Sequence, residues 1–294
     1  MTLPLRHFLL ALSVVAIWGS NFVVIRWGLN AFPPLLFAAL RFTFAAIPAV
    51  FLVPRPQVSW RNLAAYGALV GVGQFGLLYL AMRSQISPGL ASLVIQTQVF
   101  FTLLLAMRLS GERVQGFQWL SLAMAAAGIG VIASHTDGST TVLGLAMVLL
   151  AAFSWSSGNI VGKRAGAVNM LAYVVWSSVF AAPPLYALSL VVEGPAQMGD
   201  ALRHAGLGAW GAVLWQSVGN TLFGYGAWSF LLSRYPAATI VPMALLVPVF
   251  GMSCSALLLG EGLPPWKLAA AALVISGLAV NLLWPRVRGV LRAA

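Results

Sequence analysis

Long, uninterrupted apolar runs of about 20 residues are the feature that most restricts how this chain can fold, because that length is what a helix needs to cross the hydrocarbon core of a bilayer. Only 7% of the 294 residues are charged, whereas a typical soluble domain has about a quarter. The polar surface is therefore too small for a soluble fold. Ten apolar runs can be placed, at 8–27, 34–53, 62–82, 90–108, 117–134, 142–162, 171–192, 207–232, 238–259 and 266–284.

Short turn sequences such as Phe32-Pro33-Pro34 and Ser87-Pro88-Gly89 separate these runs. Each run is predicted to be a helix, because a lone strand in lipid would leave its backbone N–H and C=O groups unpaired. The first run lacks a convincing small-residue cleavage site, so we expect a retained span and not a removed signal peptide. The sequence predicts an all-α, polytopic membrane protein with ten transmembrane helices.

The basic residues predict the orientation. If the N-terminus is cytoplasmic, the cytoplasmic segments hold eleven of the sixteen lysines and arginines, as the positive-inside rule requires. Both termini are therefore expected in the cytoplasm, with the chain in a bacterial inner membrane. The net charge of +11 is scattered along the sequence, and it forms no stripe that would indicate a nucleic-acid partner.

Three short patterns occur twice, in the same order, which indicates an internal repeat. They are Trp18-x-Ser20 with Trp155-x-Ser157, Val72-Gly73-Gln74 with Val218-Gly219-Asn220, and Gly111-Glu112 with Gly260-Glu261. We predict a first five-helix repeat over 1–138 and a second over 139–294. Because five is odd, the second repeat must enter the membrane inverted. Inverted repeats place a substrate site near the midplane, between the halves, and allow alternating access, so the repeat predicts a transporter.

The Trp18-Gly19-Ser20 stretch, Arg41-Phe42, both Gly-Glu pairs and the ten-span layout resemble EamA-type members of the drug/metabolite transporter superfamily. The resemblance covers essentially the whole chain and is greatest to the YddG-like amino-acid exporters. It implies export of aromatic and other apolar amino acids. The second half departs from the pattern at Gly262, where the first half has Arg113.

All acidic residues and histidines fall in predicted loops or at helix ends, although an ion-coupled carrier usually needs such a group near the midplane. We therefore expect facilitated, gradient-driven movement, with a proton-coupled multidrug or metabolite antiporter as the alternative. No Cys/His cluster has metal-ligand spacing, so neither a metal nor another cofactor is expected. The acidic residues and histidines are Glu112, Asp137, Glu193, Asp200, Glu261, His7, His135 and His204.

Arg41 is the only basic residue well inside a predicted span. It is a candidate counter-charge for a substrate carboxylate. The structural alternative is an arginine that snorkels to the outer interface, or one that bonds carbonyls where a neighbouring helix breaks. Because no second cavity cation is available, phosphorylated substrates are not expected.

Uncharged polar and aromatic residues within the spans are further candidates, because amides and hydroxyls can hold a zwitterion without the desolvation cost of fixed charges. Aromatic rings add apolar walls and cation–π surfaces. The alternative role of the amides and hydroxyls is hydrogen bonding between neighbouring helices. The candidates are Trp18, Ser20, Asn21, Gln74, Tyr79, Gln96, Gln98, Trp155, Ser157, Asn159, Trp215, Gln216, Asn220 and Tyr225.

An integral-membrane enzyme that modifies lipids is the alternative from another class. It would need a catalytic acid, base or nucleophile near the interface, and His135 with Asp137 is the only compact pair of that type in the sequence. That pair falls in a polar loop predicted to link the two halves, so we expect no enzymatic activity. The expected partners are a small-molecule substrate and the bilayer, and a monomer is compatible with the sequence.

Overall fold

The computed structural model describes residues 3–110, 115–135 and 140–293. Within these ranges every regular element longer than one residue is helical, and nine helical segments are long and apolar enough to cross a membrane. The chain is therefore an all-helical, polytopic membrane protein, as the composition predicts.

The first predicted half consists of five helical stretches, three of them made of several elements. The prolines at the first positions of α2 and α6 suit a helix start because an N–H at that position has no intrahelical partner. The elements are α1 (Leu5–Gly28), α2 (Pro34–Ala46), α3 (Ala49–Leu52), α4 (Trp60–Tyr66), η1 (Gly67–Gly76), α5 (Leu77–Ser84), α6 (Pro88–Val94), η2 (Ile95–Thr97), α7 (Gln98–Ser110) and α8 (Gly116–Ser134).

The second predicted half repeats this order and adds one short helix, α11, before its third stretch. The side chains of Thr141 and Asn169 cap the helices that follow them. The elements are α9 (Val142–Lys163), α10 (Met170–Val192), α11 (Pro195–His204), α12 (Leu207–Leu214), η3 (Trp215–Phe223), α13 (Gly224–Arg234), α14 (Ala237–Ile240), η4 (Val241–Leu245), α15 (Leu246–Leu259) and α16 (Pro265–Ala293).

The predicted span at 207–232 folds as one helical stretch from α12 through η3 to α13. It is not one of the nine segments apolar enough to cross a membrane, because buried polar residues such as Gln216 and Asn220 interrupt its apolar run. The tenth crossing therefore stays a prediction.

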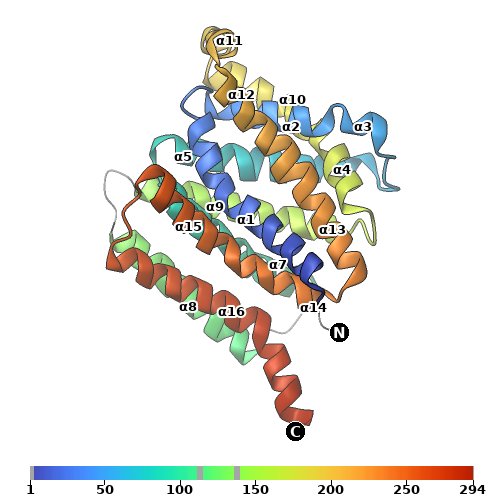
Figure 1. Cartoon of the computed structure of the whole chain (residues 1–294), viewed down its shortest axis with the longest axis vertical. Helices are drawn as coiled ribbons and strands as arrows, with labels where there is room; N and C mark the ends of the chain where they lie inside the picture. Colours follow the sequence, from blue (N-terminus) through green and yellow to red (C-terminus); the bar gives the residue numbers. More distant parts are fainter. Residues whose placement is uncertain (1–2, 111–114, 136–139, 294) are drawn as a thin grey trace.

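Contacts between helix ends fall into two separate groups. At one end, Arg26 bonds to the carbonyl oxygen of Arg83, and Glu193 accepts from the backbone N–H of Leu35. At the other, Asn62 donates to the carbonyl oxygen of Val161, and His7 pairs with Tyr235. Successive long helices thus run in opposite directions, and the start of α1 and the end of α16 lie at the same lower end of the molecule (Figure 1).

Two kinds of irregular helix recur at corresponding places in the halves. η1 and η3 are π-helical, whereas η2 and η4 are 3₁₀-helical. The repeated patterns Val72-Gly73-Gln74 and Val218-Gly219-Asn220 lie within η1 and η3. π-Helical stretches are rare and concentrate at functional sites, so η1 and η3 indicate where the site lies.

Small residues let several helices approach closely. Gly19 of α1 lies against the backbone of α15 at Gly251, and Gly67 of η1 lies against the backbone of α10 at Ser177. Helices α8 and α16 pack side by side along one edge of the molecule (Figure 1). The remaining helices enclose the centre, where η1, η3, α2 and α10 meet.

Candidate functional site

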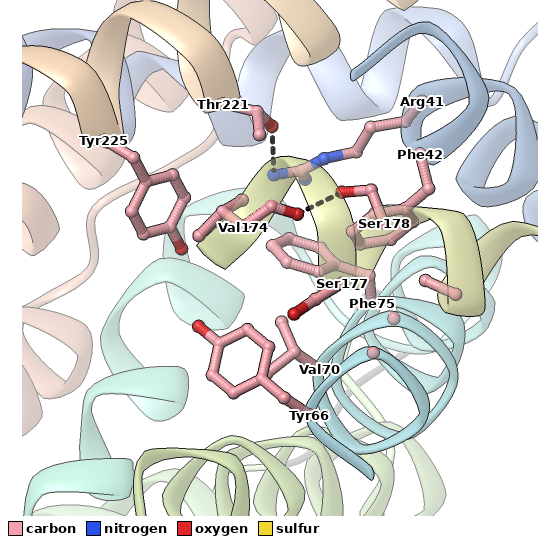
Figure 2. A pocket seen from close by; sticks show the side chains of 13 residues that line it. Arg41, Phe42, Tyr66, Val70, Phe75, Val174, Ser177, Ser178, Thr221 and Tyr225 are labelled. Atoms are coloured by element: carbon pink, nitrogen blue, oxygen red, sulfur yellow. Dashed lines mark hydrogen bonds between the residues drawn. The ribbon is translucent and has the colours of Figure 1, made fainter. Parts of the chain in front are cut away.

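A narrow pocket lies between the two predicted halves. Residues from α2, α4 and η1 of the first half and from α10, η3 and α13 of the second line it (Figure 2). The free space inside the pocket is only about 10 Å³, which is about what one water molecule needs. The helices must therefore move apart before the pocket can hold a metabolite.

Arg41 is the charged side chain of this pocket, and it is 1% exposed. Its Nη1 donates to the hydroxyl of Tyr79 over 3.2 Å and to Oε1 of Gln216 over 3.1 Å. Its Nη2 donates to Oγ1 of Thr221 over 3.2 Å, a bond that Figure 2 draws. All three partners are neutral, and the burial excludes snorkelling to the interface.

The guanidinium is also held against an aromatic face. Its Cζ lies 3.7 Å from the ring centroid of Phe75 and 5.4 Å from that of Phe42, and cation–π contact of this kind is stronger in a desolvated site. The hydroxyl of Ser217 donates to the carbonyl oxygen of Arg41 over 2.9 Å. η3 therefore fixes both the backbone and the side chain of Arg41.

The acidic side chains that the structure describes are engaged away from Arg41. Glu193 accepts from the N–H groups of Leu35 and Leu36 at the start of α2. Glu261 pairs with Lys267, and Asp200 with His204. Glu112 lies outside the described residues. Within the described part of the chain, the positive charge of Arg41 therefore has no carboxylate partner.

Several buried polar atoms near the centre have no hydrogen-bond partner among the described residues. They include Nε of Arg41, Nε2 of Gln216 and Oγ of Ser177, together with Oδ1 of Asn21 and Oε1 of Gln74. Buried polar groups are normally paired, and leaving one unpaired costs about 1–3 kcal/mol. The atoms of Arg41 and Gln216 are N–H donors, so a hydrogen-bond acceptor would pair both.

The lower part of the pocket is aromatic. Figure 2 shows the hydroxyls of Tyr66 and Tyr225 pointing toward the same space. The ring of Tyr225 lies 5.7 Å from that of Trp18, centroid to centroid, and the Nε1 of Trp18 donates to the carbonyl oxygen of Asn220 over 3.1 Å. These rings provide an apolar surface beside the charged group.

The structure thus brings together six of the predicted site residues. Arg41, Tyr79 and Gln216 form one hydrogen-bonded cluster, and the hydroxyl of Tyr79 donates to Oε1 of Gln216 over 3.0 Å. The other three form an adjoining cluster, in which Tyr225 lies on the pocket wall; they are Trp18, Asn220 and Tyr225.

Of the six residues in these clusters, Arg41 and Tyr225 line the pocket itself, and the other nine predicted site residues belong to neither cluster. Asn159 donates to Gln98 over 2.9 Å between α9 and α7, and Trp215 is 38% exposed. Ser20 and Ser157 bond to carbonyls of their own helices. The remaining four, all buried or half-buried, are Asn21, Gln74, Gln96 and Trp155.

Sequence reasoning missed Tyr66, Phe75, Ser177 and Thr221. Ser177 and its neighbour Ser178 are polar residues within the apolar run at 171–192, and Thr221 follows the predicted Asn220, so a polarity signal existed for these. Tyr66 lies in the apolar run at 62–82 and has the same polarity signal as Tyr79, whereas Phe75, which lies in η1, has none.

The sequence offered His135 with Asp137 as a catalytic pair, and of these two Asp137 lies outside the described residues. The His135 ring stacks on Trp266, with centroids 5.1 Å apart, and its Nδ1 contacts Ser134 and the carbonyl oxygen of Val131. These contacts are those of a helix-end residue that packs locally.

Comparison with known proteins decides the family. The sequence profile of the EamA-like transporter family matches residues 5–134 and 142–283. The chain belongs to the EamA-like transporter family. This EamA-like chain is a multi-pass inner-membrane protein, in agreement with the nine apolar helices among its described residues.

The relatives of this EamA-like chain include proteins named as probable amino-acid metabolite efflux pumps. One from Salmonella typhimurium is 40% identical over 291 residues and covers 97% of each chain. One from Escherichia coli (strain K12) is 38% identical over 279 residues and covers 93% of each. A solved crystal structure with a TM-score of 0.64 and 21% identity covers 96% of this chain and 98% of its own, which shows a shared fold.

Proposed function

We propose that this protein is a facilitated exporter of small carboxylate-bearing metabolites, with neutral aromatic and apolar amino acids as its cargo. Cargo crosses by alternating access between two inverted five-helix repeats, over 1–138 and 139–294, in a ten-span topology with both termini in the cytoplasm. The observation that carries the proposal is the buried guanidinium of Arg41, which lies between the halves and lacks a carboxylate partner in the described part of the chain.

A buried charge without an opposite charge is strongly destabilising, and such residues within membrane segments are rare and functional. Arg41 bonds only to neutral groups in the described residues and keeps a free Nε. The guanidinium fork matches a carboxylate and can bind it bidentately. A cargo carboxylate is therefore the group that Arg41 is suited to hold.

The walls of the pocket are suited to bind the side chain of the cargo. Phe75, Tyr66 and Tyr225 place rings below the guanidinium (Figure 2), and aromatic rings stabilise apolar or aromatic cargo side chains. The names of the Salmonella typhimurium and Escherichia coli relatives, probable amino-acid metabolite efflux pumps, support the same class of cargo.

Alternating access is supported by the position of the pocket and by the repeated geometry. Helices of both halves line the pocket, and the family profile matches one stretch in each half. The two π-helical stretches occupy corresponding places. The narrow free space fits an occluded arrangement that opens when one half rocks against the other.

Uncoupled movement is supported by the chemistry of the wall. Among the described residues that line the pocket, none is an aspartate, a glutamate or a histidine. These are the groups that proton-driven carriers use as relays. A proton-coupled multidrug or metabolite antiporter is the competing function, and a lipid-modifying enzyme is the alternative from another class.

The test is counterflow in proteoliposomes. The purified protein is reconstituted, loaded with unlabelled phenylalanine, and supplied with labelled phenylalanine, tryptophan or methionine in the absence of any ion gradient. Saturable uptake that Arg41→Gln abolishes would support the proposal. Arg61→Gln is the matched control, because Arg61 is exposed. Uptake that requires an imposed proton gradient would favour the antiporter.

A further inference from the structure

We infer that the preferred cargo carries a net charge of −1, as a monocarboxylate derived from an apolar or aromatic amino acid whose amino group is acylated or replaced. This inference rests on the carboxylate-binding role in the proposed function and changes the preferred cargo from the neutral amino acid to an anionic derivative of it. It also supplies a driving force for export, since an anion responds to the membrane potential.

The charge balance of the pocket is the first argument. Among the described residues that line the pocket, Arg41 is the one with a formal charge. A bound monoanion would bring the site to zero net charge. A zwitterionic amino acid would leave it at +1, in a buried environment where an uncompensated charge is strongly unfavourable.

The hydrogen-bond inventory points the same way. Oε1 of Gln216 already accepts from both Arg41 and Tyr79, so its two lone pairs are in use. Oγ1 of Thr221 accepts from Arg41 and donates to the carbonyl oxygen of Gln216. The acceptors around the guanidinium are thus consumed within the cluster, whereas Nε of Arg41 and Nε2 of Gln216 remain as unused donors.

An ammonium group would find neutral partners on the pocket wall, such as the hydroxyls and ring faces of Tyr66 and Tyr225, but among the described lining residues no carboxylate to offset its charge. The ring face of Phe75, a possible cation–π surface, is already covered by the guanidinium at 3.7 Å. Oγ of Ser177 is an unpaired atom on the pocket wall, but a hydroxyl donates as readily as it accepts. The unpaired oxygens of Asn21 and Gln74 belong to residues outside the pocket lining.

The membrane potential would supply energy for the export of an anionic cargo. One elementary charge that crosses a potential of 100 mV gains about 2.3 kcal/mol, which corresponds to a roughly 50-fold concentration ratio at equilibrium. In a cell whose interior is negative, a uniporter for a monoanion is therefore driven outward without a coupling ion. A uniporter for a zwitterion receives no such help.

The test compares N-acetyl-L-phenylalanine with L-phenylalanine at pH 7.5, where the first is an anion and the second a zwitterion. Proteoliposomes are loaded with either labelled compound, and valinomycin with a potassium gradient sets the interior to be negative by about 100 mV. Efflux is followed with and without the potential. Protein-free liposomes measure the leak of each compound.

We expect N-acetyl-L-phenylalanine to leave about tenfold faster than phenylalanine, because phenylalanine brings an ammonium into a pocket that already holds Arg41. Two like charges about 8 Å apart at an effective dielectric constant of about 20 repel by more than a tenfold ratio requires. Efflux of N-acetyl-L-phenylalanine should accelerate with the negative potential, and that of phenylalanine should not. Arg41→Lys should keep the preference, and Arg41→Gln should release neither compound faster than the leak.

Efflux of phenylalanine that equals or exceeds that of the acetylated compound would overturn this inference and leave the proposed function in place. Efflux of neither compound from wild-type vesicles would overturn both. Since the potential dependence is measured on the wild-type protein, the test stands even if an Arg41 variant fails to fold.

Discussion

Arg41 of α2 and Gln216 of η3 are joined by a buried hydrogen bond of 3.1 Å, although 175 residues separate them in the sequence. This bond crosses the boundary between the two predicted halves. Gln216 presents its oxygen to the guanidinium, so the amide takes the place that a carboxylate would occupy in an internal ion pair. The neutrality of this partner keeps the positive charge of Arg41 available.

We therefore predict that Gln216→Glu inactivates the protein without unfolding it. The new carboxylate has the same shape and would pair with Arg41, which removes the charge that cargo needs. Counterflow in proteoliposomes should fall by about tenfold or more, since charge-assisted pairs are about twice as strong as neutral bonds. The thermal midpoint in detergent should stay the same or rise.

Gln197→Glu is the control for that change, because Gln197 is exposed on α11 and receives the same added charge far from the pocket. Wild-type counterflow in the Gln216→Glu protein would show that the charge of Arg41 is not used for cargo.

The buried ion pair between Glu261 and Lys267 predicts a stability effect. Glu261 accepts from Lys267 over 2.9 Å and from the backbone N–H of Gly89, also over 2.9 Å, and Lys267 is 4% exposed. Glu261→Gln leaves the Lys267 ammonium buried without its counter-charge, which should destabilise the protein by about 3 kcal/mol. A lower thermal midpoint in detergent would report the loss.

The double variant Glu261→Gln with Lys267→Met separates pairing from packing. If the ion pair matters, the double variant should be more stable than the sum of the two single changes indicates, because the pair is then removed as a unit. Strict additivity of the two effects would contradict a coupled pair.

The candidate residues around Arg41 could be selected from the sequence, but the contacts between them could not. Arg41 stands out in the sequence as a lone charge within an apolar run, and Gln216 and Tyr79 stand out as polar residues in such runs. Their meeting depends on how α2, α5 and η3 pack, which no local pattern encodes. Trp215, an equally plausible candidate, lies on an exposed face instead.

The carboxylate of Glu193 provides a third prediction. It accepts from the N–H groups of Leu35 over 2.6 Å and Leu36 over 3.0 Å, at the positive end of α2. Glu193→Gln should lower the free energy of unfolding by about 1 kcal/mol, because a negative charge at a helix N-terminus is stabilising. Thermal melting should detect the change, and Asp200→Asn on exposed α11 is the control.

A pH series provides the fourth prediction. Since none of the described pocket-lining residues is an acid or a histidine, the counterflow rate should vary by less than about twofold between pH 6 and 8, the range in which an ordinary histidine titrates. A steep, sigmoidal dependence would instead indicate a coupling group and favour the proton-coupled antiporter.

The π-helical turn of η1 has a consequence for how such a site can change. Each residue of a regular helix advances about 100° around its axis, and Tyr79 lies just beyond η1, in α5. Removal of a single residue from η1 would therefore rotate Tyr79 away from Arg41 while every side chain of the site stayed the same. Insertions and deletions, as well as substitutions, are thus a route by which evolution can retune this pocket.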